Sequence, residues 1–287
     1  MKIEFDCVPC IYRQVLEASR MVINEEQDRE LIRDIINEFA RMVPEIKNEE
    51  NAPQVVAKIQ NYIKQRTGIN DPYYKFKKKN MESAFKYYPD VVQSVKKSRD
   101  SLLASLVMSA MGNSIDAGIS LDIDIKGNIK EAVEKGFKYS DYQIFKTKLR
   151  NADRLLLIAD NVGEAVFDKL LIQELLQYKL KIIYAVRETP ILNDITIKEA
   201  KKIGLNNYCT VISSGCDTPG TILSSSNTKF INEYSKADII ISKGQGNLEG
   251  LLDDSRPIFF LLKIKCDLIS RRLNNGLQTG DFVFIYR

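Results

Sequence analysis

The spacing of apolar residues divides the chain into a helical first part and a second part in which strands alternate with helices. Over the first part, apolar residues recur every three or four positions, which is typical of one buried face of an α-helix. We expect helices over residues 11–42 with a break at Asn24, from Asn51 onward, over 71–88 and over 90–111. No strand pattern interrupts them, so we predict a helical N-terminal region over residues 1–115.

From Arg154 onward, short apolar runs alternate with amphipathic stretches. Strand, helix and strand in repetition indicate an α/β fold with a mainly parallel sheet and helices on both faces. We predict that this second domain covers residues 116–287. The expected strands are 155–159, 181–186, 208–212, 237–242, 257–262 and 282–286, the last in either direction, and the expected helices are 129–138, 141–151, 164–178, 193–203 and 221–234.

The first of these strands leads directly into two polar residues, Asp160 and Asn161. A continuous apolar run fits a strand buried on both faces, and ligands of parallel sheets bind where such strands end. The two side chains therefore indicate a site. Helix capping is the alternative, because both residue types also cap helices well.

Polar residues follow the other strands as well, and the carboxyl ends of parallel strands open on one edge of the sheet. We therefore expect these groups to converge. They are Asp160, Asn161 and Glu164 after the first strand, Arg187, Glu188, Asn193 and Asp194 after the second, Ser213, Ser214 and Asp217 after the third, Lys243-Gly244-Gln245-Gly246-Asn247 after the fourth, and Lys263 and Lys265 after the fifth.

The residue types in these loops indicate phosphate chemistry on a metal. Asp160, Asn161 and Asp194 offer oxygen ligands, which suit Mg²⁺ or Mn²⁺. Lys243 adds positive charge, and the glycines beside it let backbone N–H groups approach an anion. We expect the substrate contacts to come from Glu164, Ser213, Lys243, Gly244 and Asn247.

Several protein classes are excluded by what the sequence lacks. The chain has no histidine, which rules out Ser-His and Cys-His nucleophile pairs and a histidine-bound zinc or iron. It has no GxxxxGK[ST] motif, and Gly163 lacks the spaced glycines of a dinucleotide site. Val162 stands where a phosphatase that forms an aspartyl phosphate on a DxD motif would need a second aspartate.

Composition and charge describe an ordinary globular protein of 287 residues, with 44% hydrophobic and 28% charged residues. The net charge of +4 is modest and the lysines are scattered outside residues 75–79, so we expect no nucleic-acid partner. No apolar run reaches the ~18 residues that span a bilayer, and the chain does not begin like a signal peptide. We therefore predict a cytoplasmic protein without a membrane partner. The oligomeric state is left open.

The five cysteines include a CxxC, formed by Cys7 and Cys10. An odd number of cysteines in such a chain argues against a disulfide framework. The pair fits a redox motif, half of a zinc site, or two small buried apolar residues. These three interpretations remain open.

The sequence resembles the DUF89 family of metal-dependent damage-control phosphatases, in particular its compact archaeal-type branch with an N-terminal CxxC. The resemblance implies a helical region on a Rossmann-like α/β/α domain and hydrolysis of phosphorylated metabolites with a divalent cation (Mn, Mg, Co or Ni). It places the metal ligands at Asp160, Asn161 and Asp194 and the phosphate-binding lysine at Lys243. The matching segments are Cys7–Cys10, 112–116 (GNSID), 160–164 (DNVGE), 193–196 (NDIT), 217–221 (DTPGT) and 243–247 (KGQGN).

We interpret the chain as a phosphatase for small phosphomonoesters, such as sugar phosphates, in which a metal-activated water attacks phosphorus. Asn113 and Asp116 would contact the substrate, and Asp160, Asp194 and Lys243 would carry the catalysis. The sequence leaves open whether Asp160 or Asp194 is the general base, and whether Asp160 itself attacks. The alternatives are a carboxyl methyltransferase that uses S-adenosylmethionine, which some relatives suggest, and a non-enzymatic metal or redox module built on the CxxC.

Overall fold

A seven-stranded sheet forms the centre of the computed structural model, which describes residues 1–116, 131 and 133–287, with the side chains of 113–116 left out. The strand order is β1-β7-β6-β5-β2-β3-β4. All neighbouring pairs are parallel except β6 and β7, which are antiparallel. The strands are β1 (Tyr139–Ser140), β2 (Arg154–Ile158), β3 (Lys181–Val186), β4 (Thr210–Ser213), β5 (Ile239–Lys243), β6 (Phe259–Lys263) and β7 (Phe282–Tyr286).

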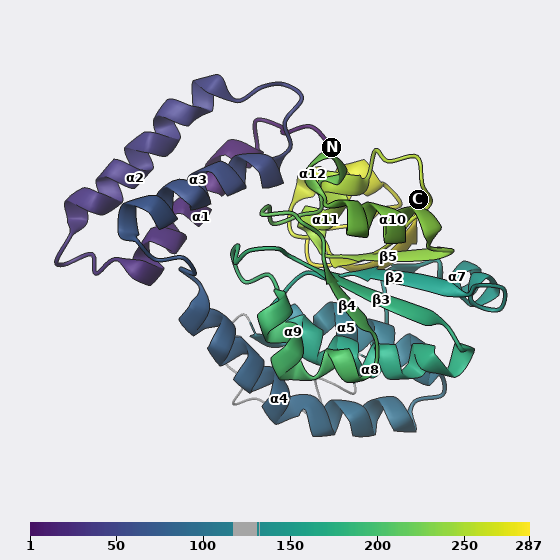
Figure 1. Cartoon of the computed structure of the whole chain (residues 1–287). Helices are drawn as coiled ribbons and strands as arrows, with labels where there is room; N and C mark the ends of the chain where they lie inside the picture. The colour runs from purple at the N-terminus through teal and green to yellow at the C-terminus, as the bar shows by residue number, and fades with distance from the viewer. Residues whose placement is uncertain (117–130, 132) are drawn as a thin grey trace.

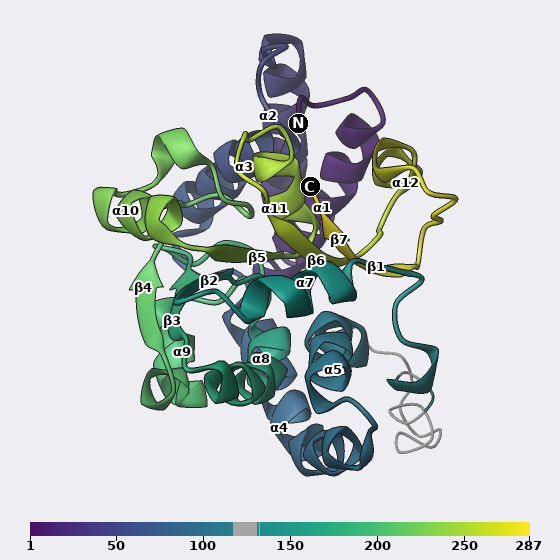
Figure 2. The ribbon, with the colours of Figure 1, turned by 90° about the vertical axis from the view of Figure 1, so that its right-hand side faces the viewer.

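Helices cover both faces of the sheet, so the fold class predicted from the sequence is confirmed (Figure 2). Alternate residues of each strand point to opposite faces, and both faces carry apolar side chains. One face packs against α4 (Tyr74–Lys97), α5 (Ser101–Asp116), α7 (Tyr142–Leu149), α8 (Val162–Leu175) and α9 (Ile197–Ile203). The other packs against α10 (Thr228–Lys236), α11 (Gln245–Leu251) and α12 (Asp267–Leu273).

The first three helices form a separate hydrophobic cluster beside the sheet (Figure 1). They are α1 (Cys7–Val22), α2 (Arg29–Met42) and α3 (Ala52–Thr67). A capping box at Asn51 begins α3, and Gly68, in the left-handed conformation, ends it. We call these three helices the cap, because they stand at the carboxyl edge of the sheet. Short 3₁₀ helices cover Val43–Glu45, Leu176–Tyr178, Leu205–Asn207 and Leu223–Ser225.

Helices α4 and α5 belong to the core of the sheet and not to the cap. Their buried residues pack with those of α8 in one continuous cluster. The division of the chain at residue 115 stays a prediction, since it follows the change from helices to strands and not a boundary between two cores.

The predicted break between two helices at residues 88–90 is wrong. Helix α4 runs through Pro89 without interruption, and the chain turns at Ser98. A proline inside a helix costs about 3 kcal/mol. Buried Ala84, Val91 and Val95 hold both halves of α4 on the same core, which offsets this cost.

Two expected helices are shorter than predicted, since α9 begins at Ile197 and α10 at Thr228. Residues 112–116, expected to lie beyond a helix that ends at residue 111, instead form the last turn of α5. The helix expected over 129–138 lies largely outside the described residues. Helices α11 and α12 and the short strand β1 were not predicted.

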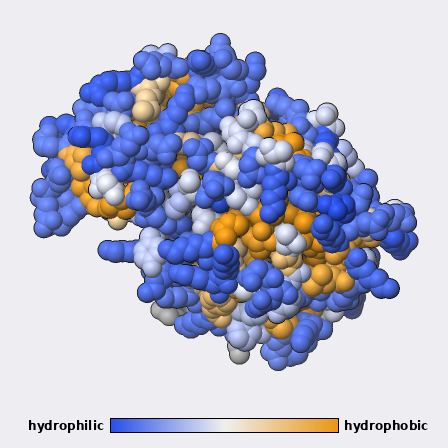
Figure 3. All heavy atoms as spheres, viewed as in Figure 1, coloured by the Kyte–Doolittle hydropathy of each residue, from blue (hydrophilic) through white to orange (hydrophobic). Residues whose placement is uncertain are grey.

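Among the described residues, no helix is both long enough and apolar enough to cross a membrane. The face of the molecule seen in Figure 3 is largely hydrophilic, with apolar side chains gathered near its middle.

Candidate active site at the carboxyl edge of the sheet

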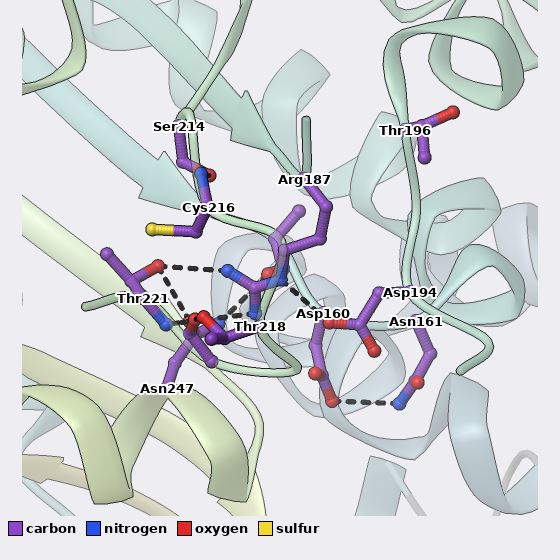
Figure 4. Close-up of polar contacts among 12 residues, drawn as sticks. Asp160, Asn161, Arg187, Asp194, Thr196, Ser214, Cys216, Thr218, Thr221 and Asn247 are labelled. Carbon is purple, nitrogen blue, oxygen red and sulfur yellow. Dashed lines mark hydrogen bonds and ion pairs between the residues drawn. The ribbon is translucent and has the colours of Figure 1, made fainter. Parts of the chain in front are cut away.

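The loops that follow β2 and β3 are bound to each other through their backbones. The N–H of Ile195 donates to the carbonyl of Asp160 at 2.9 Å, and the N–H of Val162 donates to the carbonyl of Asn193 at 3.0 Å. An isolated bridge also pairs Asn161 with Asp194. The structure therefore brings Asp160, Asn161 and Asp194 together, as expected from their places after neighbouring strands (Figure 4).

The two carboxyl groups are buried close together. Burial, followed by the charge of Asp194, raises the pKa of Asp160 to about 6. Burial also raises the pKa of Asp194, although the Arg187 guanidinium lowers it in part. Two carboxylates that resist ionisation in this way would be stabilised by a cation between them.

Asn161 directs its amide nitrogen toward the carboxylates of Asp160 and Glu164. Its Nδ2 donates to Asp160 Oδ2 at 2.8 Å and to Glu164 Oε1 at 3.3 Å. The side-chain amide would therefore have to flip, exchanging its nitrogen and oxygen, to offer the oxygen to a cation. No group of three His, Cys, Asp or Glu side chains is placed to hold a metal in the described part of the chain. Two carboxylates and one amide oxygen, completed by water or substrate, nevertheless suit a hard divalent cation.

A cleft of about 610 Å³ opens beside these residues, between the cap and the carboxyl edge of the sheet. Helix α1 contributes Cys7 and Cys10 to its wall. Lys265 also lines the cleft. It lies near enough to the two carboxyl groups that its positive charge lowers the pKa of both Asp160 and Asp194. The cleft therefore joins an acidic end, suited to a cation, to a lysine suited to an anion.

Lys243 lies elsewhere than expected for a phosphate-binding lysine. Its side chain is fully buried and does not line the cleft. The Nζ atom is 2.6 Å from Asp168 Oδ1 and 2.8 Å from Glu164 Oε2. It also donates to the carbonyl of Ser109 at 3.1 Å. In this structure Lys243 is thus the counter-charge of two buried carboxylates under the site.

Glu164 shares this buried position with Lys243 instead of facing the cleft. Burial raises its pKa to about 7, and Lys243 opposes the rise. Through Asn161, Glu164 is connected to Asp160. Glu164 therefore helps to hold the acidic end of the cleft in place through the Asn161 side chain, without lining the cleft itself.

Three other expected substrate contacts also lie away from the cleft lining. Asn247 is fully buried, and its amide donates to the carbonyls of Ala159 and Lys243. Ser213 donates its hydroxyl to Glu188. Gly244 has a φ of +80°, and a Cβ there would come within 2.1 Å of Asp160 Oδ2, so only glycine fits. The side chains of Asn113 and Asp116 lie outside the described part of the structure.

Sequence reasoning gave no role to three residues of this region: Arg187, Lys265 and Asp168. Asp168 had a detectable signal, because it stands four residues after Glu164, among apolar residues in the first half of α8. Two acidic groups on one face of a buried helix require a buried cation. Arg187 and Lys265 are among the polar residues expected to converge at the sheet edge, but nothing in the sequence gives either of them a particular role there.

The fold and the geometry of the site together define the class of protein to which the chain belongs. This is a three-layer α/β/α protein with a cleft at the carboxyl edge of a mainly parallel sheet and buried carboxylates at the ends of neighbouring strands. Residues 3–279 match the damage-control phosphatase ARMT1-like domain. The chain belongs to this family, and the resemblance to DUF89 proteins is confirmed.

Individual relatives cover nearly the whole chain. It is 33% identical to a damage-control phosphatase of Pyrococcus horikoshii, over 95% of this chain and 94% of the relative. It is 32% identical to an uncharacterized protein of Methanocaldococcus jannaschii, over 100% and 96%, and 27% identical to a damage-control phosphatase of Archaeoglobus fulgidus, over 99% and 98%. The crystal structure of a DUF89 family protein from Pyrococcus horikoshii superposes with a TM-score of 0.89 at 28% identity, over 99% of both chains.

Proposed function

We propose that this protein is a divalent-metal-dependent phosphatase that hydrolyses small phosphomonoesters, such as phosphorylated sugars. The observation that carries the proposal is the buried pair Asp160 and Asp194 at the floor of a cleft that Lys265 also lines. The names of the relatives from Pyrococcus and Archaeoglobus support a phosphatase. The cytoplasmic location stays a prediction.

Asp160, Asp194 and Asn161 would hold the cation. When bound, a divalent cation polarises a phosphoryl group and lowers the pKa of a coordinated water. Lys265 would attract the phosphate into the cleft and stabilise the negative charge on its oxygens. A buried aspartate whose pKa is raised is also suited to accept a proton from water, and Asp160 has this property.

The proposal is tested with metal-stripped protein and p-nitrophenyl phosphate. We expect no turnover in EDTA and recovery on addition of Mn²⁺, Mg²⁺, Co²⁺ or Ni²⁺. Turnover that is unchanged by EDTA would contradict the metal-dependent mechanism. Methyl transfer to a carboxylate, the alternative activity, would instead require S-adenosylmethionine and leave the ester intact.

Lys265 offers a direct test of phosphate binding. Removing one charged donor from a reacting oxyanion typically costs about 10²-fold or more in rate. We expect Lys265→Met to reduce kcat/KM by about 10²-fold and to leave the Mn²⁺ affinity within a few fold of the wild type. Lys181→Met is the control, because Lys181 is exposed at the start of β3, at the end of the sheet away from the cleft. Equal losses in both variants would exclude a specific role for Lys265.

The CxxC pair should be dispensable for hydrolysis, although Cys7 and Cys10 line the cleft. Hard cations prefer oxygen to sulfur, and burial raises the pKa of Cys7, which disfavours a reactive thiolate. We expect the double variant Cys7→Ser, Cys10→Ser to keep its kcat within a few fold and to lose at most about 1 kcal/mol of stability. Abolished turnover in a folded, metal-loaded double variant would place the sulfurs in the catalytic site.

A further inference from the structure

Arg187 lies directly after β3 and is one of the largest fully buried side chains of the protein. Its guanidinium does not line the cleft, so it is not placed to touch a substrate there. A buried cation is costly unless its hydrogen-bond donors are satisfied. The partners of Arg187 therefore indicate why it is buried.

Three nitrogens of Arg187 donate to three separate segments of the chain (Figure 4). Nε donates to Asp194 Oδ2 at 2.7 Å, in the loop after β3. One terminal nitrogen donates to Thr221 Oγ1 at 3.0 Å, in the segment that follows β4. The other donates to Asn247 Oδ1 at 2.9 Å, in the helix after β5. Arginine suits this position because its donors form a rigid fork.

The partners of Arg187 are fixed in turn. Asn247 Oδ1 also accepts from the N–H and the hydroxyl of Thr221, both at 2.8 Å. The Asn247 amide nitrogen donates at 2.9 Å to the carbonyl of Ala159, the residue before Asp160. The network thus extends from Asp194 to the backbone that carries Asp160.

The geometry assigns Arg187 as a positioning residue that presets the cation site, an inference that rests on the proposed metal-dependent function. It holds one oxygen of Asp194, while the other oxygen lies on the side of Asp160 and Asn161 (Figure 4). Its positive charge also lies beside the two buried carboxylates. Groups that orient metal ligands in this way typically account for 10–100-fold in metal affinity or activity.

The test uses Arg187→Lys in the full-length protein. Lysine keeps the positive charge but cannot donate in a rigid fork to three chain segments. We expect the Kd for Mn²⁺, measured by isothermal titration calorimetry, to rise about 10- to 100-fold. At saturating Mn²⁺, kcat for p-nitrophenyl phosphate should fall while KM stays within about threefold of the wild type. Arg41→Lys, on the exposed surface of α2, is the matched control and should change neither value.

Each outcome of this test either supports or overturns the positioning role of Arg187. A folded Arg187→Lys protein whose Kd for Mn²⁺ stays within twofold of the wild type, with only a lower Tm, would show that Arg187 serves stability alone. If Arg187→Lys does not fold, Thr221→Val decides, since it removes one anchor of the guanidinium but keeps the Arg187–Asp194 pair. An unchanged Kd in Thr221→Val would then overturn the inference. A wild-type protein that neither binds Mn²⁺ nor hydrolyses the ester would overturn the proposed function as well.

Discussion

Asp160→Ala is expected to abolish Mn²⁺ binding and to reduce kcat more than 100-fold, because residues that only support metal ligands already account for about 10–100-fold. Mn²⁺ at 100 times its Kd should stabilise the wild-type protein by about 2.7 kcal/mol. This stabilisation should be absent in the variant. Thermal unfolding with and without Mn²⁺, together with the ester assay, measures both effects.

The control for this variant is Asp153→Ala. Asp153 is exposed and directly precedes β2, whereas Asp160 follows the same strand at its other end. A normal response of Asp160→Ala to Mn²⁺ would remove Asp160 from the set of metal ligands. Asp194→Ala should behave like Asp160→Ala, and the two losses should not add, because both carboxylates serve one ion.

Asp160 should also lower the stability of the metal-free protein. A carboxyl whose pKa is raised to about 6 by burial binds its proton more tightly in the folded state. Its destabilising effect is absent below pH 4, grows as the pH rises toward 6, and is complete above that value. In EDTA we therefore expect Asp160→Asn to be more stable than the wild type at pH 7.5 and equal to it at pH 4.

Lys243→Met is expected to destabilise the protein by about 3–5 kcal/mol, since it leaves the carboxylates of Glu164 and Asp168 buried without their cation. Urea unfolding of the metal-free protein measures this loss. Without the lysine, burial acts on the pKa of Glu164 without this opposing charge and favours its protonated form, so the loss should be smaller at pH 5 than at pH 8. Lys181→Met, the exposed control, should change stability by less than about 0.5 kcal/mol.

A second substitution tests whether the buried charges act as a group. Asp168→Asn keeps a hydrogen-bond partner for Ser109 and Tyr184 but removes one negative charge. Combined with Lys243→Met, it should cost less than the sum of the two single losses. If Lys243→Met instead keeps its stability and loses only affinity for phosphate, the lysine acts as a direct substrate contact.

The fold could be predicted from the sequence wherever an element is regular and buried. The bounds expected for β3 and β7 agree with the structure, because their apolar runs end abruptly at polar residues. Pro89 predicted a break that tertiary packing overrides. Helices α11 and α12 have only seven residues each, which is too short for a clear helical period.

The site could be predicted in part. The sequence places Asp160, Asn161 and Asp194 at one edge, because parallel strands end together. It does not show how far each side chain reaches toward the cleft. Lys243 has the same strand parity as Ile239 and Ile241, so its side chain faces the helices on that side of the sheet and not the edge. That parity predicts the buried position of Lys243, whereas the cleft that Lys265 lines appears only in three dimensions.

The two glycines of α11 have a consequence for mutational scans of this protein. A Cβ on Gly246 would lie 1.8 Å from the carbonyl oxygen of Pro219, and one on Gly250 would lie 2.2 Å from that of Thr221. The helix and the neighbouring loop therefore touch backbone to backbone, which side chains would forbid. Intolerance to substitution at Gly246 would thus reflect this close contact between two chain segments. It would be observed whether or not residues 243–247 bind a phosphate.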